Sequence, residues 1–140
     1  MNYYFSNSLL MARNKSTLLT ESELPIMQIL WEQGANTVAA VADALPRDPP
    51  LAYSTVLTTL RTLEQKGYVK HTKLGRAFVY DAIVDSSKAS GDALRFVVSR
   101  FFTGSASRMV QNLIESEEIS SIELRRLKIL IAESERKENA

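Results

Sequence analysis

The chain of 140 residues contains no cysteine, a single histidine and no long apolar segment. The lack of cysteine excludes disulfide bonds and thiolate metal sites, and it agrees with the reducing conditions of the cytoplasm, where we expect the protein. No apolar run approaches the roughly 20 residues that a membrane-spanning helix needs. Residues 1–10 carry no basic side chain and make a poor signal peptide, so we expect no membrane insertion and no export.

The same scarcity argues against catalysis. The only histidine, His71, has no cysteine to activate and no second histidine with which to share a metal ion, and no glycine-rich phosphate loop is present. Neighbouring carboxylates such as Glu117 and Glu118 follow helical surface patterns, which is their ordinary place. We therefore expect a protein that is not an enzyme and that uses neither a cofactor nor a metal ion.

The charges of the chain are nearly balanced overall but are unevenly distributed. The whole chain has a formal net charge of +1. Residues 53–80 hold five basic side chains and one acidic side chain, Glu64, which is a local net charge of +4 and leaves −3 for the rest of the chain. Positive charge gathered in one part of a balanced protein suggests an anionic partner, although a solvated surface gives the same pattern.

Two helices are predicted near the start of the chain. Thr20 to Glu23 forms a capping box, in which a hydroxyl and a glutamate satisfy free amides at a helix start, and an apolar stripe follows. Thr37 is placed to cap a second, short helix. The proline-rich segment 46–50 cannot continue that helix and predicts a loop.

A third helix is predicted from Tyr53 to Lys66, with an apolar stripe on one side and Gly67 placed to end it in a left-handed cap. The opposite face carries short hydroxyl side chains, one aromatic ring and one arginine, with no acid before Glu64. A solvated helix face more often alternates glutamate and lysine, so this face favours contact with a polyanion. Its residues are Tyr53, Ser54, Thr55, Thr58, Thr59, Arg61 and Thr62.

Two extended segments follow, 68–72 and 76–80, both rich in β-branched and aromatic residues. With Lys73 at the start of the intervening turn and Arg76 just after it, they predict a β-hairpin with a cationic tip. Three helices followed by a hairpin make a winged helix-turn-helix, whose third helix reads base edges in the major groove of DNA. We expect Lys73 and Arg76 to hold the DNA backbone. Thr37 either offers its helix N-terminus to a phosphate or serves only as a cap.

The C-terminal segment, residues 83–140, is helical in pattern throughout. Its helices have apolar faces but too little surface of their own to bury them, so we expect them to pack against a second copy of the chain. The alternative is that they pack onto the first domain. The residues predicted for the dimer contact are Leu94, Val97, Val98, Phe101, Phe102, Val110, Leu113, Ile114, Leu124, Leu127, Leu130 and Ile131.

Together these patterns predict a mainly α protein in three parts. Residues 1–18 show no clear period and are expected to be a flexible extension. Residues 19–82 are expected to form the winged-helix DNA-binding domain, and residues 83–140 a helical dimerisation domain. A competing hypothesis is a winged helix that binds another protein without specific DNA binding; the +4 stretch and the acid-free helix face argue against it.

Several segments are typical of one bacterial family. They are Leu19-Thr-Glu-Ser-Glu and Ile29-Leu-Trp, then Leu51-Ala-Tyr-Ser-Thr-Val-Leu-Thr-Thr-Leu-Arg-Thr-Leu-Glu-Gln-Lys-Gly and Arg76-Ala-Phe-Val-Tyr, and finally Phe101-Phe-Thr-Gly-Ser and Glu115-Ser-Glu-Glu-Ile-Ser. With them the chain resembles the BlaI/MecI repressors, the penicillinase and methicillin-resistance regulators, over residues 19–131. The resemblance implies a homodimer on a pseudo-palindromic operator, in the family typically built on TACA and TGTA half-sites, which represses its own gene and a neighbouring one.

The resemblance also bears on how repression would end. In the best-known members, a membrane sensor with a zinc-protease domain leads to cleavage of an Asn-Phe bond in the repressor's tail. The matching bond here joins Asn112 and Leu113, so leucine replaces the phenylalanine. A membrane sensor protease, acting directly or indirectly, is thus an implied partner. The paired Cys-x-Cys motifs of a copper-responsive branch are missing, which excludes that mechanism of metal sensing.

Overall fold

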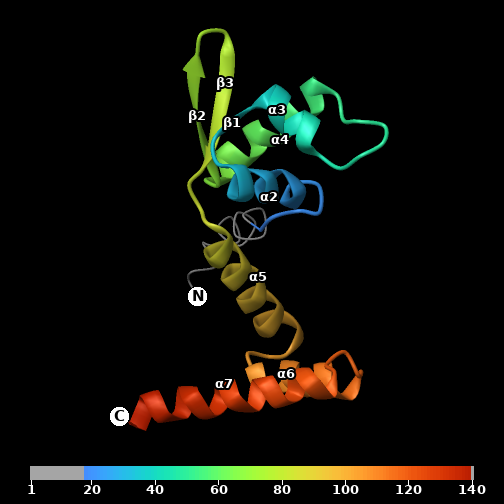
Figure 1. Ribbon diagram of the computed structural model, residues 1–140, viewed down its shortest axis with the longest axis vertical. Coiled ribbons are helices and arrows are strands. Elements are labelled where there is room, and N and C mark those ends of the chain that lie inside the picture. Colours follow the sequence, from blue (N-terminus) through green and yellow to red (C-terminus); the bar gives the residue numbers. More distant parts are fainter. Residues whose placement is uncertain (1–17, 140) are drawn as a thin grey trace, which may run out of the picture. The chain divides into compact units, whose positions relative to one another are not determined.

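The computed structural model describes residues 18–139 (Figure 1). The expected extension 1–18 therefore lies outside the described residues except for its last position. Elements follow one another as α2 (Leu24–Gln33), β1 (Asn36–Thr37), α3 (Val38–Ala44), α4 (Tyr53–Lys66), β2 (Val69–Leu74), β3 (Ala77–Ala82), α5 (Ser86–Phe101), α6 (Ala106–Glu115) and α7 (Ser121–Asn139). Three helices and a hairpin in this order confirm the predicted mainly helical, winged-helix fold.

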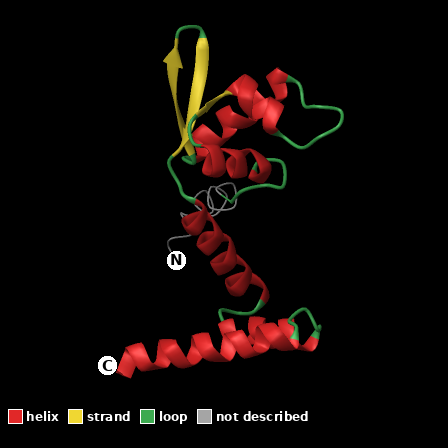
Figure 2. Cartoon of the chain, in the orientation of Figure 1, coloured by secondary structure: helices red, strands yellow, loops and turns green. Residues whose placement is uncertain are grey.

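The chain divides within α5 into two compact units, one that ends at Leu94 and one that begins at Arg95. We call residues 18–94 the head and residues 95–139 the tail. Within the part of the chain that the structure describes, every strand lies in the head, as Figure 2 shows.

The core of the head is built from the apolar stripes of α2, α3 and α4. Met27, Val41 and Leu60, one from each helix, are fully buried, and Val69 and Tyr80 of the hairpin close the same cluster. The buried residues of α4 are Val56, Leu60 and Leu63, at the four- and three-residue spacing of a helix face, so the stripe predicted for α4 is buried. In α2 the buried face includes Ile26 and Ile29, while Leu24 is exposed. The core thus fixes α4 by one face and leaves the other face free.

The start of α2 differs from the prediction. The capping-box bonds form, because the Glu23 amide donates to Thr20 Oγ1 (3.2 Å) and the Thr20 amide donates to Glu23 Oε1 (2.8 Å). Residues 21–23 nevertheless make a hydrogen-bonded turn, and α2 begins only at Leu24. The reason is Pro25, which lacks the amide proton that would bond to the Glu21 carbonyl and continue the helix backwards.

The sheet has the order β1-β3-β2, with antiparallel pairs throughout. The predicted turn was wrong: Lys73 lies on β2, and the two-residue connection consists of Gly75 and Arg76. Gly75 has φ +64°, and hairpin turns of two residues favour glycine at a first position with positive φ. Arg76 consequently sits at the very tip of the hairpin rather than in its second strand.

The helices of the tail begin with the caps that the sequence suggests. Ser105 Oγ accepts from the Arg108 amide at the start of α6 (3.2 Å), and Ser120 exchanges hydrogen bonds with Glu123 at the start of α7 (both 3.2 Å). At α5, which starts in the head, the cap is Asp85, whose Oδ1 accepts from the Lys88 amide (2.8 Å). A carboxylate is a good acceptor at this position because it also opposes the helix dipole.

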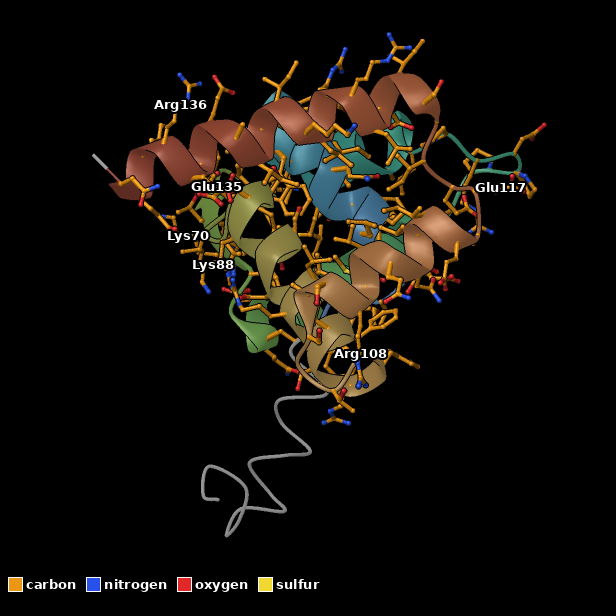
Figure 3. All side chains as sticks on the ribbon, turned by 90° about the horizontal axis from the view of Figure 1, so that it is seen from below. Lys70, Lys88, Arg108, Glu117, Glu135 and Arg136 are labelled. Atoms are coloured by element: carbon orange, nitrogen blue, oxygen red, sulfur yellow. The ribbon has the colours of Figure 1, made fainter. Side chains whose placement is uncertain are left out.

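Apolar side chains in the tail have no core to enter. Neither α6 nor α7 contains a buried residue. Phe101 is 74% exposed, and Ile114 and Ile131 are 45% and 58% exposed. Charged side chains such as Glu135 and Arg136 of α7 are exposed, and Figure 3 shows Arg136 pointing away from the helix. The tail by itself therefore leaves its apolar faces largely uncovered.

Candidate nucleic-acid interface

The free face of α4 is organised as two parallel stripes. Ser54, Thr58, Arg61 and Gln65 follow one another at intervals of four, three and four residues, which places them on one line opposite the buried stripe, and all four are exposed. We call them the central stripe. Beside it runs a flanking stripe at the same spacing, whose members are Thr55, Thr59 and Thr62. Neither stripe carries an acid.

Three hydroxyls of these stripes are bonded to the backbone of α4 itself. Thr58 Oγ1 donates to the Ser54 carbonyl (2.9 Å), and Thr59 Oγ1 donates to the Thr55 carbonyl (3.0 Å). Thr62 Oγ1 repeats the pattern with the Thr58 carbonyl (3.1 Å). Tyr53, at the first position of α4, is 49% exposed and so belongs to the free surface rather than to the core.

The hairpin presents two different faces. Cross-strand pairing puts His71 opposite Tyr80 and Lys73 opposite Phe78, and the Lys73 ammonium lies 5.9 Å from the centre of the Phe78 ring. The other face pairs Lys70 with Asp81, opposite charges that favour the pairing. Lys73 and Lys70 are therefore separated by the sheet, although both are exposed.

The face that carries Lys73 is also the face that meets α4. His71 Nδ1 lies 2.7 and 2.9 Å from the two carboxylate oxygens of Glu64, near the end of α4. Tyr80 is buried beneath, and burial raises the pKa of its hydroxyl; the Glu64 carboxylate raises that pKa further, while Arg61 opposes the change. These contacts hold the hairpin beside the free face of α4, with Lys73 toward the tip.

The positive charge of residues 53–80 is smaller at the surface than the sequence suggests. Lys66 points inward, with its ammonium 2.8 Å from Glu23 Oε1 and 3.0 Å from the Leu18 carbonyl oxygen. The Lys66 and Glu23 side chains are only 12% and 5% exposed. Lys66 is therefore a structural residue that neutralises a buried carboxylate. Arg61, Lys70, Lys73 and Arg76 remain exposed, and none of them forms an ion pair within residues 18–139.

The sequence of the chain matches one family model, which is described as "Penicillinase repressor", over residues 19–133. The chain belongs to the penicillinase repressor family. It is 28% identical over 115 residues to the penicillinase repressor of Bacillus licheniformis, a match that covers 82% of this chain and 90% of the relative. It is 20% identical over 118 residues to the methicillin resistance regulatory protein MecI of Staphylococcus aureus, covering 84% of this chain and 96% of the relative.

Likeness to solved structures is looser. An ArsR-like transcriptional regulator from Rhodococcus sp. RHA1 matches with a TM-score of 0.47 and 20% identity, over 74% of this chain and 92% of that chain. A structure described as reduced AbfR bound to DNA matches with a TM-score of 0.45 and 19% identity, over 79% and 84% of the two chains. The assignment therefore rests on the sequence matches, and the family resemblance expected from the sequence is confirmed.

As a member of the penicillinase repressor family, the chain is a DNA-binding transcriptional regulator of the repressor kind and not an enzyme. Among residues 18–139 no group of three or more metal-ligating side chains comes together, and no helix there is long and apolar enough to cross a membrane.

Thr37, the remaining residue of the repressor that was predicted to contact DNA, lies at the junction of β1 and α3. Its Oγ1 accepts from the Ala40 amide (3.1 Å), so the hydroxyl does act as the N-cap of α3. Thr37 also pairs with Val79 of β3, which ties the start of α3 to the base of the hairpin. The sequence had no signal for β1, because a strand of two residues is defined by its partner.

Gln65 and Lys70 are exposed polar residues of the head that were not among the predicted DNA-contact residues. Gln65 ends the central stripe at a helical interval from Arg61, a signal that was available because the spacing can be read from the sequence alone. Lys70 was counted in the basic stretch but was not assigned to a site, and it lies on the face of the hairpin away from α4. Only the strand register shows that placement.

The residues predicted for the dimer contact and the predicted cleavage bond lie in the tail, except for Leu94 at the end of the head. Val97, Phe101, Val110 and Ile114 are exposed, as are Leu94, Leu130 and Ile131, while the others predicted for the dimer contact (Val98, Phe102, Leu113, Leu124 and Leu127) are half-buried. The bond between Asn112 and Leu113 lies inside α6, with Asn112 exposed.

Proposed function

We propose that the repressor binds a pseudo-palindromic operator as a homodimer, with α4 in the major groove of each half-site. The observation that carries this proposal is the outward face of α4, on which Ser54, Thr58 and Arg61 stand in one line without a carboxylate. Short side chains let a helix approach the base edges closely, and an arginine reaches either guanine or a phosphate. Tyr53 and the flanking stripe are the other α4 residues assigned to DNA contact.

Backbone contacts would come from the hairpin and from α3. Arg76 at the tip and Lys73 on the face toward α4 are exposed cations, which suits them to hold phosphates on either side of the groove. Thr37 would add the amides at the start of α3, because helix N-termini attract anions. None of these contacts reads sequence, so their role is to fix the position of α4.

The tail supports the homodimer in this proposal. Its helices expose large apolar side chains that a solvated monomer would leave in water, Phe101 and Ile131 among them. A second copy offers the same faces in reverse, so that a twofold interface buries both sets. Dimerisation then places two copies of α4 on one side of the DNA at the spacing of two half-sites.

Inactivation by cleavage between Asn112 and Leu113 stays a prediction. The bond lies within α6, where the backbone is hydrogen-bonded and helical. A protease needs an extended segment, so α6 would have to unwind locally before the bond could be cut. Mass spectrometry of the repressor recovered from induced cells would detect fragments that end at Asn112; an intact chain in induced cells would contradict the prediction.

The proposal is tested by binding to the DNA upstream of the repressor's own gene and to a site selected from random DNA. Fluorescence anisotropy across a salt series, with scrambled DNA as competitor, gives the affinity and the specificity together. We expect competitor-resistant binding with two chains per site. Weak binding that is equal for the candidate operators and for scrambled DNA would overturn the proposal and favour a winged helix that binds another protein.

A further inference from the structure

The hydroxyl groups of α4 differ in whether their protons are available. A threonine hydroxyl has one proton, and in Thr58, Thr59 and Thr62 that proton is donated to a backbone carbonyl one turn earlier. The hydroxyls of Ser54 and Thr55, in the first turn, donate no hydrogen bond within the described residues. The first turn of α4 therefore keeps its donors, while the middle of the helix has none left among its threonines.

This difference decides which base edges the middle of α4 can recognise. A threonine whose proton is spent presents a methyl group and the lone pairs of its oxygen. In the major groove guanine presents only acceptors, whereas thymine presents a methyl group and adenine and cytosine present amino donors. The middle of α4 thus offers guanine a donor only from Arg61. Its threonines offer an oxygen that can accept from adenine or cytosine and a methyl group that can pack against the methyl group of thymine.

We infer that Thr58 is a specificity-determining residue that selects thymine through its methyl group and not through its hydroxyl. This inference rests on the proposed insertion of α4 into the major groove. Thr58 is the candidate because it stands at the centre of the central stripe and is exposed, while Thr59 and Thr62 are half-buried to one side. Arg61, three residues further along the same line, is the donor next to Thr58 that can reach guanine.

Two variants of Thr58 separate the methyl from the hydroxyl. Thr58→Val keeps the shape and the methyl but loses the hydroxyl, and we expect its affinity for the selected operator to stay within about twofold of the parent. Thr58→Ser keeps the hydroxyl and loses the methyl, and we expect affinity to fall about fourfold, the value of one buried methyl-sized group. Thermal unfolding followed by circular dichroism controls for the stability of each variant.

The partner methyl is tested from the side of the DNA with the unaltered repressor. Each thymine of a half-site is replaced in turn by deoxyuridine, which removes only the 5-methyl group, and a thymine outside the half-sites serves as control. One position in each half-site is expected to lose about fourfold in affinity. At that position the loss should nearly vanish in Thr58→Ser, because both changes remove the same contact.

Each outcome has a defined meaning. If the parent prefers no DNA sequence over scrambled DNA, the proposed function itself fails. If the parent binds its operator specifically but Thr58→Val loses more affinity than Thr58→Ser, the hydroxyl is the reading group and the inference is overturned. A selected operator in which no thymine is sensitive to deoxyuridine would overturn it as well.

Discussion

Head and tail are both built mainly from helices, but their apolar side chains have different surroundings. In the head, Leu60 and Met27 are completely buried among residues of the same chain. In the tail, α6 and α7 have no buried side chain, and Phe101 is 74% exposed. Similar amphipathic patterns in the sequence therefore lead to a finished core in one region and to an unfinished one in the other.

The difference teaches that the two regions should owe their stability to different things. Burial within one chain makes folding of the head independent of protein concentration. If a second copy covers the apolar faces of the tail, as proposed, the order of the tail depends on protein concentration. Trp31, which is the only tryptophan of the chain, lies in the head and donates to the Val84 carbonyl oxygen (2.9 Å), so its fluorescence reports on the head alone.

The largest effect is expected at the buried ion pair of the head. Lys66→Met would leave the Glu23 carboxylate buried without its cation, which typically destabilises a fold by about 3–5 kcal/mol. Urea denaturation followed by Trp31 fluorescence measures the loss. The exposed Lys70→Met is the matched control and should change stability by less than about 0.5 kcal/mol. Equal stability of Lys66→Met and the parent would show that the pair contributes nothing to the head.

In the tail, a comparable change should act on assembly rather than on the head. Leu127→Asp places a charge on the proposed dimer face of α7, and we expect a loss of about 2 kcal/mol, or roughly 30-fold in the dimer dissociation constant. Analytical ultracentrifugation measures that constant. The midpoint of urea denaturation followed by Trp31 fluorescence should not change. The control is Arg126→Asp. Arg126 lies on a different side of α7, because adjacent helical residues point about 100° apart. Dimerisation that is unchanged in Leu127→Asp would contradict the proposed face.

How far the sequence could predict the fold follows from how local each signal is. The bounds of α4 and its free face were predicted, because the apolar stripe and the left-handed cap at Gly67 (φ +89°) are encoded within the helix itself. The pair of Lys66 with Glu23 was not, because the two residues are 43 positions apart and either could have been solvated. The position of the hairpin turn was predicted wrongly. The turn follows from the strand register, and the register depends on cross-strand pairs that a single strand does not show.

The hairpin offers a smaller and purely electrostatic effect in the head. Arg76→Ala should weaken binding to operator and scrambled DNA alike, because a phosphate contact carries no sequence information. The slope of log K against log salt should become shallower by about 0.9 units, the value for one phosphate contact on B-DNA. Fluorescence anisotropy at several salt concentrations measures both slopes. A loss confined to operator DNA would instead assign Arg76 to base recognition.

The smallest effect compares the same local device in both regions. Thr37 and Ser120 are helix N-caps whose hydroxyls accept from the Ala40 and Glu123 amides (3.1 and 3.2 Å), and replacing such a cap by alanine typically removes about 1 kcal/mol. In Thr37→Ala the loss should appear in the Trp31 urea curve at any protein concentration. In Ser120→Ala it should appear as weaker dimerisation, because this cap begins α7, which carries part of the proposed dimer face. A change of the Trp31 curve in Ser120→Ala would mean that the two units do not unfold separately.

Thr37→Ala has a second readout: a shallower salt slope for DNA binding would add a phosphate contact to its role as a cap.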